Sequence, residues 1–189
     1  MGEYPSTRPG GWAGGGDPVP APLRLHRTTV PPEWVDYNRH MTESAYLLVM
    51  GDGSDAFFRY IGIDEAYRAS GASLYTVETH LRNLREASLG DSLELTLRVL
   101  GVDGKRVHIA HEVFGGAREE AGTLLATGEQ MLLHVDTVAA RTSPLPPVLR
   151  SRLGEIARAH AVLPVPDWVG RAMRIPEPVP EEADAWTSS

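Results

Sequence analysis

The strongest restriction on the fold of this chain is a single long helical pattern followed by an almost unbroken series of strand patterns. From about Thr42, apolar side chains recur at helical spacing as far as Ile61. A second, short helix is predicted over residues 63–70. Gly51 and Gly53 fall inside the long helix, where a glycine costs roughly 1 kcal/mol relative to alanine. A helix that keeps both is expected to lie against a close neighbour, such as a sheet wrapped round it.

Strand patterns occupy most of the remaining sequence. In residues 93–99, leucine and valine alternate with polar residues, which is typical of a half-buried strand. Asp103 and Gly104 then give a hairpin turn signal. The predicted strands cover residues 23–30, 74–85, 93–99, 106–114 and 123–135, and a C-terminal helix is predicted over 149–161. This order implies an α+β fold with one five-stranded antiparallel sheet curled round the long helix. The open strand edges of such a sheet favour a second subunit.

Composition divides the 189 residues into three parts. Residues 1–21 are rich in glycine and proline and are predicted to form a flexible arm. Residues 22–163 are expected to form one well-packed domain. Residues 164–189 are Pro-rich and acidic, and are predicted to extend along the surface.

Charge and residue usage exclude several classes of function. The formal net charge is −7 and no basic block is present, so nucleic acid is not an expected partner. The chain has no cysteine, which excludes a disulfide scaffold, a thiolate nucleophile and a cysteine zinc site. No apolar run approaches the roughly 18 residues of a membrane span, and no export signal pattern is recognised. These features together predict a cytoplasmic protein without a membrane partner.

A polar loop lies between the first predicted strand and the long helix. It places an acid (Asp36), an amide (Asn38) and an imidazole (His40) within five residues. Free backbone N–H groups and the helix dipole favour negative charge at a helix N-terminus. The loop is therefore a candidate catalytic site. From spacing alone, Asp36 is either a catalytic acid or a turn residue that leads into the helix.

The loop also carries a family resemblance. Asp36-x-Asn38-x-His40-Met41, followed by Tyr46, resembles the D-x-x-G-H-V-N-x-x-x-Y signature of the 4-hydroxybenzoyl-CoA thioesterase-like family of hotdog folds. Two positions depart from the signature. Arg39 replaces its glycine, so a positive φ is not expected there, whereas Thr42 replaces its asparagine and is expected to cap the helix.

Further stretches extend the resemblance over roughly residues 23–163. Residues 89–91 resemble the family's turn between its second and third strands. Residues 34–38, 76–80 and 126–137 are most similar to the betainyl-CoA thioesterases, the branch often fused behind L-carnitine dehydrogenase. The resemblance implies a hotdog fold, a homodimer as the minimal active unit, sometimes a dimer of dimers, and hydrolysis of an acyl-CoA such as betainyl-CoA. Coenzyme A is then part of the substrate, and neither a separate cofactor nor a metal is expected.

The resemblance also implies roles for residues near the loop. Asp36 stands where the family has its nucleophile or general base. Backbone N–H groups near Glu43 and Ser44 are expected to stabilise the oxyanion. His40 either polarises the substrate carbonyl or orients the loop.

Substrate contacts are predicted from chemistry. A quaternary ammonium binds ring faces, and CoA phosphates need basic groups. The predicted substrate-binding residues are Trp34, Tyr37, Asn38, Thr42, Tyr46, Tyr75 and Glu78, and the predicted CoA-binding residues are Arg82, Arg85 and Arg106, with Lys105 as a further candidate.

Other readings of the same residues stay open or are disfavoured. A thioesterase for a different acyl-CoA and a non-catalytic acyl-CoA-binding module both fit the motif. A hotdog hydratase is disfavoured because the proline of its motif is missing. His108 and His111 are expected on opposite faces of a strand, which disfavours a metal pair. Gln130 is expected to make a buried hydrogen bond, and the absence of a G-x-S-x-G elbow disfavours an α/β-hydrolase.

Overall fold

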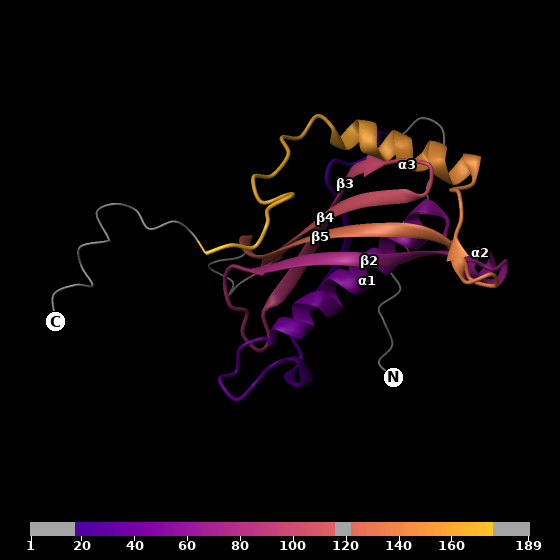
Figure 1. The fold of residues 1–189 in the computed structure, drawn as a ribbon. Coiled ribbons are helices and arrows are strands. Elements are labelled where there is room, and N and C mark those ends of the chain that lie inside the picture. Colours follow the sequence, from indigo (N-terminus) through magenta and orange to yellow (C-terminus); the bar gives the residue numbers. More distant parts are fainter. Residues whose placement is uncertain (1–17, 116–121, 176–189) are drawn as a thin grey trace.

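The chain forms a curled antiparallel sheet with one long helix lying across its inner face (Figure 1). The computed structural model describes residues 18–115 and 122–175. Most of the predicted arm and part of the predicted extension lie outside these residues. The strands are β1 (Leu23–Thr29), β2 (Ala72–Asn83), β3 (Ser92–Val102), β4 (Arg106–Gly115), β5 (Thr123–Asp136) and β6 (Arg141–Thr142), in the order β1-β3-β4-β5-β2 with β6 beside β5. The helices are α1 (Glu43–Ile61), α2 (Glu65–Ala69) and α3 (Pro147–His160), preceded by a 3-10 turn, η1 (Pro32–Trp34). The α+β prediction is confirmed.

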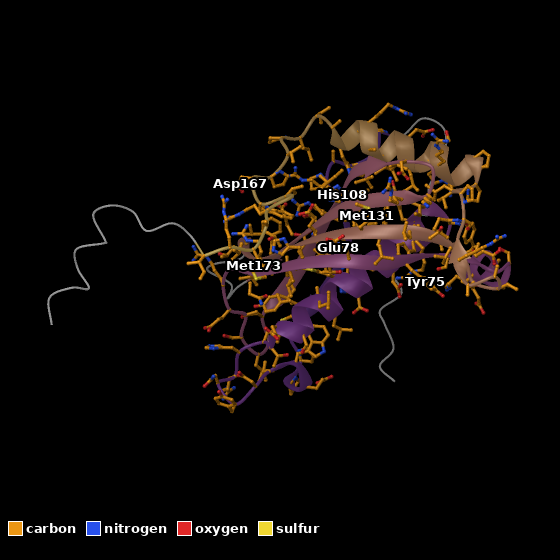
Figure 2. All side chains as sticks on the ribbon, viewed as in Figure 1. Tyr75, Glu78, His108, Met131, Asp167 and Met173 are labelled. Carbon is orange, nitrogen blue, oxygen red and sulfur yellow. The ribbon has the colours of Figure 1, made fainter. Side chains whose placement is uncertain are left out.

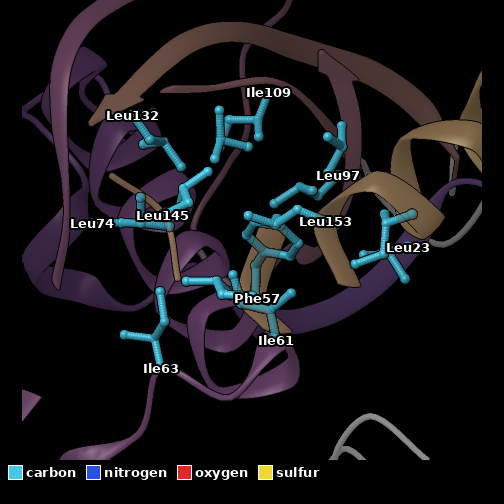
Figure 3. Close-up of a cluster of buried hydrophobic side chains, with 14 residues drawn as sticks. Leu23, Phe57, Ile61, Ile63, Leu74, Leu97, Ile109, Leu132, Leu145 and Leu153 are labelled. Atoms are coloured by element: carbon cyan, nitrogen blue, oxygen red, sulfur yellow. The ribbon is translucent and has the colours of Figure 1, made fainter. Parts of the chain in front are cut away.

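Helix α1 is fixed by two clusters of buried apolar side chains. Its C-terminal half places Phe57 and Ile61 against Leu97 and Ile109 of the sheet and Leu153 of α3 (Figure 3). Its N-terminal half packs in the same way on the other end of the sheet. Burial of each such side chain contributes roughly 1.5–3 kcal/mol. The helix is therefore held along its length, which fixes the position of its N-terminus.

The two glycines of α1 differ in their surroundings. A Cβ added at Gly53 would overlap the side chain of Leu95 on β3, so the predicted close approach to the sheet is confirmed there. A Cβ at Gly51 would meet nothing within 4 Å. Within a single chain Gly51 therefore has no close neighbour, and the prediction is wrong for this residue.

Several element ends differ from the predicted ones. Helix α3 begins at Pro147 rather than residue 149, because proline fits the first turn of a helix, where its missing N–H leaves nothing unpaired. Helix α2 is shorter than predicted, because the Asp64 side chain accepts a hydrogen bond from Tyr67 N–H at 2.9 Å and so begins the helix at Glu65. The short strand β6 was not predicted.

The segment after α3 crosses the face of the sheet opposite α1. Arg98 Nη1 donates to the Pro164 carbonyl at 2.8 Å, and Gly170 N–H donates to the Glu129 carboxylate at 2.7 Å. Trp168 lies between these anchors and is buried. Figure 2 labels Asp167 and Met173 on this segment. In the described part of the chain, no helix combines the length and apolar character needed to cross a membrane.

Candidate active site

The loop ahead of α1 forms a tight turn around Asp36. Asp36 N–H donates to the His40 carbonyl at 3.0 Å, and Arg39 N–H donates to the Asp36 carbonyl at 2.9 Å. The side chain takes part as well, because Asp36 Oδ1 accepts from Asn38 N–H at 2.8 Å. Asn38 therefore contributes its backbone to the turn.

Arg39 adopts the left-handed conformation that the sequence did not predict. Its φ is 65°. The expectation that an arginine here would abolish a positive φ is therefore wrong, because the surrounding hydrogen bonds impose the turn. A non-glycine residue in this conformation costs on the order of 1–3 kcal/mol, and such strain concentrates at functional sites.

Neighbouring segments hold the loop from both sides. Thr42 N–H donates to the Trp34 carbonyl at 2.9 Å, which closes the loop at its base. Met41 N–H donates to the Ala87 carbonyl at 2.8 Å. His40 forms an isolated antiparallel bridge with Ser88. The segment after β2 thus fixes the loop against the start of α1.

The N-terminus of α1 lacks the side-chain cap predicted for Thr42. Thr42 is the N-cap residue, but its side chain makes no capping hydrogen bond. Its hydroxyl lies 3.2 Å from the Ser44 hydroxyl instead. The predicted capping role is therefore wrong. Ala45 N–H donates to the Thr42 carbonyl at 3.1 Å, so the N–H groups of Glu43 and Ser44 are the ones at this helix end that can bind an anionic oxygen.

A cavity of about 240 Å³ opens beside this helix end. It is lined by Met41, Glu43, Tyr46, Asn83, Leu84, Arg85 and Glu86. Three predicted site residues, Glu43, Tyr46 and Arg85, thus meet in one place. The Tyr46 hydroxyl donates to the Arg85 carbonyl at 3.1 Å, and burial raises the pKa of this phenol.

Glu86 is a cavity residue that the sequence did not identify. Its Oε2 lies 3.1 Å from Nδ1 of His40. The two residues are 46 positions apart, and Glu86 falls in an irregular segment with no motif around it. The chain offered no local signal for this contact.

The other predicted aromatic contacts do not gather around the cavity in one chain. Tyr37 is 93% exposed, and Trp34 packs against the apolar cluster beside the N-terminal half of α1. Tyr75 lies on β2 near α2 and is 54% exposed (Figure 2). Because Tyr75 is eight residues from the cavity residue Asn83, a strand rise of about 3.3 Å per residue separates them by roughly 26 Å.

The remaining predicted contacts are also spread along the sheet. Glu78 and Arg82 both lie on β2, where Glu78 is exposed and Arg82 is half-buried. Arg106 forms an ion pair of 2.6 Å with Asp103 at the β3–β4 turn. Hydrogen bonds from the backbone N–H of Lys105 and from Arg106 lower the pKa of Asp103 to about 2. A second cavity, of about 430 Å³, lies beside this turn, at the opposite end of β5 from Asp36.

A buried polar group joins the middle of α1 to the sheet. The Ser54 hydroxyl lies 3.2 Å from His111 Nε2 and donates to Gln130 Oε1 at 3.3 Å. Burial lowers the pKa of His111 to about 4. The prediction of a buried hydrogen bond for Gln130 is confirmed. His108 faces the other way and pairs with Glu129 at 2.7 Å, which confirms the opposite orientation of the two histidines. The described residues contain no cluster of three or more His, Asp or Glu side chains that could bind a metal.

Comparisons with known proteins identify the family of the chain. Residues 30–153 match the family described as the Thioesterase-like superfamily. The L-carnitine dehydrogenase/betainyl-CoA thioesterase of Rhizobium meliloti is 47% identical over 165 residues, which cover 85% of this chain and 33% of that protein. The chain thus spans about a third of the length of such bifunctional relatives.

Two shorter proteins match over nearly their whole length. The betainyl-CoA thioesterase of Pseudomonas aeruginosa is 43% identical over 155 residues, which cover 82% of this chain and 96% of that protein. A hypothetical protein of Staphylococcus aureus, solved in complex with CoA, superposes with a TM-score of 0.75 and 26% identity over 84% of this chain and 99% of that one. The chain therefore belongs to the thioesterase-like superfamily.

Proposed function

We propose that this chain is an acyl-CoA thioesterase that hydrolyses betainyl-CoA to betaine and CoA. The observation that carries the proposal is the hydrogen-bonded turn of residues 36–40 immediately before α1, whose first residue follows an N-cap without a side-chain capping bond. Asp36 belongs to this turn and is not among the residues that line the cavity. The relatives from Rhizobium meliloti and Pseudomonas aeruginosa, both named for betainyl-CoA, support the choice of acyl group. CoA bound to the Staphylococcus aureus protein supports the thioester class.

The turn suits Asp36 to activate water or to attack the thioester. Asn38 N–H occupies Oδ1, so we assign the reacting role to Oδ2. As general base, Oδ2 takes a proton from water while the water oxygen bonds to the carbonyl carbon. The tetrahedral intermediate then collapses, the C–S bond breaks, and the thiolate of CoA takes up a proton. As nucleophile, Oδ2 would instead form a mixed anhydride that water hydrolyses.

The start of α1 supplies the second requirement, a place for the oxyanion. The Thr42 side chain contacts the Ser44 hydroxyl rather than the backbone, so we assign the N–H groups of Glu43 and Ser44 to the substrate. Such N–H groups and the helix dipole favour negative charge on the carbonyl oxygen. Because Glu43 is one of the residues that line the cavity, the same helix end offers a counter-charge for a cationic acyl group.

The predicted aromatic residues can surround a cationic head group only if a second chain contributes to the site. Within one chain, Tyr46 borders the cavity and Tyr75 lies at the far end of β2. Strand β2 ends the strand order of the sheet, and antiparallel pairing of two β2 edges would place Tyr75 of one copy near the cavity end of the other. We therefore propose a homodimer joined along β2. Association of two dimers and the cytoplasmic location stay predictions.

The basic groups for CoA are proposed in the same arrangement. Arg85 lines the cavity, and Arg82 lies on the same strand, β2. We assign both to the phosphates of CoA. Arg106 is held by Asp103, so its contribution requires that this ion pair exchange for a phosphate.

Thiol release over a panel of acyl-CoA substrates tests the proposal. The most informative pair is betainyl-CoA and 3,3-dimethylbutyryl-CoA, which have the same shape but differ by the positive charge. We expect faster release from the charged substrate. Asp36→Asn should lower kcat by about 10²–10⁴-fold, the usual contribution of a general base. Asp167→Asn, in the exposed C-terminal segment, is the matched control.

Each outcome of the panel has a distinct meaning. Binding of acyl-CoA without turnover of any substrate would leave a non-catalytic binding module. Equal rates of thiol release from betainyl-CoA and 3,3-dimethylbutyryl-CoA would indicate that the chain acts on a different acyl-CoA. An Asp36→Asn variant with full activity would refute the mechanism, and a single-chain mass in sedimentation would refute the dimer.

A further inference from the structure

Glu86 is the side chain at this site for which neither the motif nor the chemistry above has given a purpose. It lines the cavity at the helix end and contacts His40. It comes from the segment after β2, far from the motif in the sequence. Its carboxylate lies close to the imidazole of His40, which belongs to the motif.

The backbone fixes Glu86 and His40 relative to each other. Met41 N–H donates to the Ala87 carbonyl at 2.8 Å, and Ser88 forms a β-bridge with His40. The first contact joins the residues immediately after His40 and Glu86, and the second joins His40 itself to the residue two positions after Glu86. Paired backbone segments therefore hold the two side chains close together, and Nδ1 of His40 lies 3.1 Å from Oε2 of Glu86.

The same segment is tied to the catalytic helix. The Tyr46 hydroxyl, in the first turns of α1, donates to the Arg85 carbonyl at 3.1 Å. Arg85 and Glu86 both line the cavity. Loop, helix end and the segment carrying Glu86 thus form one rigid frame around the space proposed for the acyl group.

The contact selects one form of the imidazole. Nδ1 of His40 lies at ion-pair distance from the carboxylate of Glu86 without making a hydrogen bond to it. The negative charge disfavours a lone pair beside it, so the contact favours the proton on Nδ1. In a neutral ring, Nε2 then carries the lone pair. Without such a partner, an exposed imidazole is free to exchange tautomers and to rotate. A carboxylate holds a histidine in one tautomer and orientation in this way in the Ser-His-Asp triad.

Stability does not account for the pair. The side chains of His40 and Glu86 are 40% and 72% exposed, and exposed ion pairs contribute little to folding. An acyl group in the cavity would cover Glu86 and exclude water from it, which strengthens the contact when substrate is present. The contact is therefore expected to be stronger in the substrate complex than in the free protein.

We propose that Glu86 is a positioning residue that holds His40 in the Nδ1–H tautomer, with Nε2 directed as an acceptor for the reaction. This inference rests on the proposed thioesterase function for its kinetic consequence, but the tautomer itself does not depend on activity. Glu86 acts through His40 and does not touch the reacting atoms.

Nitrogen chemical shifts of the histidine rings test the tautomer directly. The full chain is labelled with ¹⁵N-histidine, and long-range ¹H–¹⁵N spectra are recorded at pH 8, with His40→Gln to assign the signals. We expect Nδ1 of His40 to carry the proton in the native protein. In Glu86→Ala, the signal should shift toward the Nε2–H form. An unchanged His40 tautomer in Glu86→Ala would overturn the proposal.

Kinetics test the consequence. Glu86→Ala is expected to lower kcat by about 10- to 100-fold, because misplacement of a catalytic group by about 1 Å can cost about 10²-fold, and to leave KM within about twofold. Glu86→Gln removes the charge but keeps the size of the side chain, so it should lower kcat about as much as Glu86→Ala does. Glu155→Ala, an exposed glutamate on α3, controls for loss of surface charge and should leave both constants unchanged.

The outcomes separate this proposal from the proposed function. An effect of Glu86→Ala on KM alone would mean that Glu86 contacts the substrate, which would overturn the positioning role. Full activity of Glu86→Ala would overturn it as well. A native protein that releases thiol from no acyl-CoA would refute the thioesterase function, whereas the spectra would still decide whether Glu86 fixes His40.

Discussion

Acidification should lower the free energy of unfolding by protonating His111, which lies between α1 and the sheet. The ring is completely buried among Ser54, Gln130 and the apolar core. Burial lowers the pKa of His111 from 6.5 to about 4. Its Nδ1 has no hydrogen-bond partner, so a proton added there would be buried without an acceptor. Protonation of His111 therefore favours the unfolded chain.

The sign and size of the effect follow from linkage. The folded pKa lies below the unfolded one, so this contribution to stability is complete above pH 6.5 and is lost as pH falls from 6.5 through 4. Each pKa unit corresponds to about 1.4 kcal/mol, so a difference of about 2.5 units removes on the order of 3 kcal/mol. That is a large part of the roughly 5–15 kcal/mol that stabilises a typical domain.

Urea denaturation at a series of pH values measures the loss. Native protein and His111→Gln are compared between pH 7.5 and 4.5, because the difference between them cancels the titration of all other groups, including His26 and His160, whose pKa values burial also lowers. The free energy of unfolding of the native protein should fall about 2.5 kcal/mol further than that of the variant. A difference that does not change with pH would refute the reasoning. Should the variant fail to fold, the ring protons of His111 in the native protein must still show no titration above about pH 5.

Two substitutions test the backbone geometry of the site and of its helix. Arg39→Gly should raise the free energy of unfolding by about 1 kcal/mol, because glycine adopts the observed φ of 65° without the left-handed penalty; a lower thermal midpoint would contradict a strained turn. Gly53→Ala should destabilise the fold by about 1–3 kcal/mol, because its Cβ overlaps the buried Leu95 side chain. The matched control is Gly154→Ala in α3, where the nearest atom lies at an ordinary 3.5 Å, so alanine should stabilise by up to about 1 kcal/mol in the same melting assay. Equal effects of the two glycine substitutions would contradict the close approach of Gly53 to the side chain of Leu95.

The fold was largely predictable because its signals are local and periodic. The alternation in residues 93–99 and the turn at Asp103 and Gly104 are properties of neighbouring residues, and the structure places β3, the turn and β4 accordingly. The errors at helix ends have equally local causes. The prolines at positions 144, 146 and 147 favour an end to the preceding strand, but proline is also accepted in the first turn of a helix, which is where α3 begins.

The site was less predictable because its parts are set by distant contacts. The motif located Asp36, since an acid before a helix is visible in the sequence. It did not give the φ of Arg39, which follows from hydrogen bonds across the turn rather than from the residue itself. It did not give Glu86 either, because the pairing of His40 with Ser88 that brings Glu86 close depends on how the segment after β2 folds back.

Exposed residues on α1 favour the packing of a second chain against this helix. Gly51 is exposed, and a Cβ there would meet nothing within 4 Å, so the single chain gains nothing from a residue that costs a helix roughly 1 kcal/mol. Leu47 and Leu48 lie one turn earlier and are also exposed. Glycine beside exposed leucines is the pattern expected where another backbone packs closely against a helix. Because Leu47 adjoins the cavity residue Tyr46, a chain that covers this surface would also close the acyl pocket. A dimer that covered this surface would share the site between two chains, which would explain why one chain alone gathers only part of the residues that its sequence suggests.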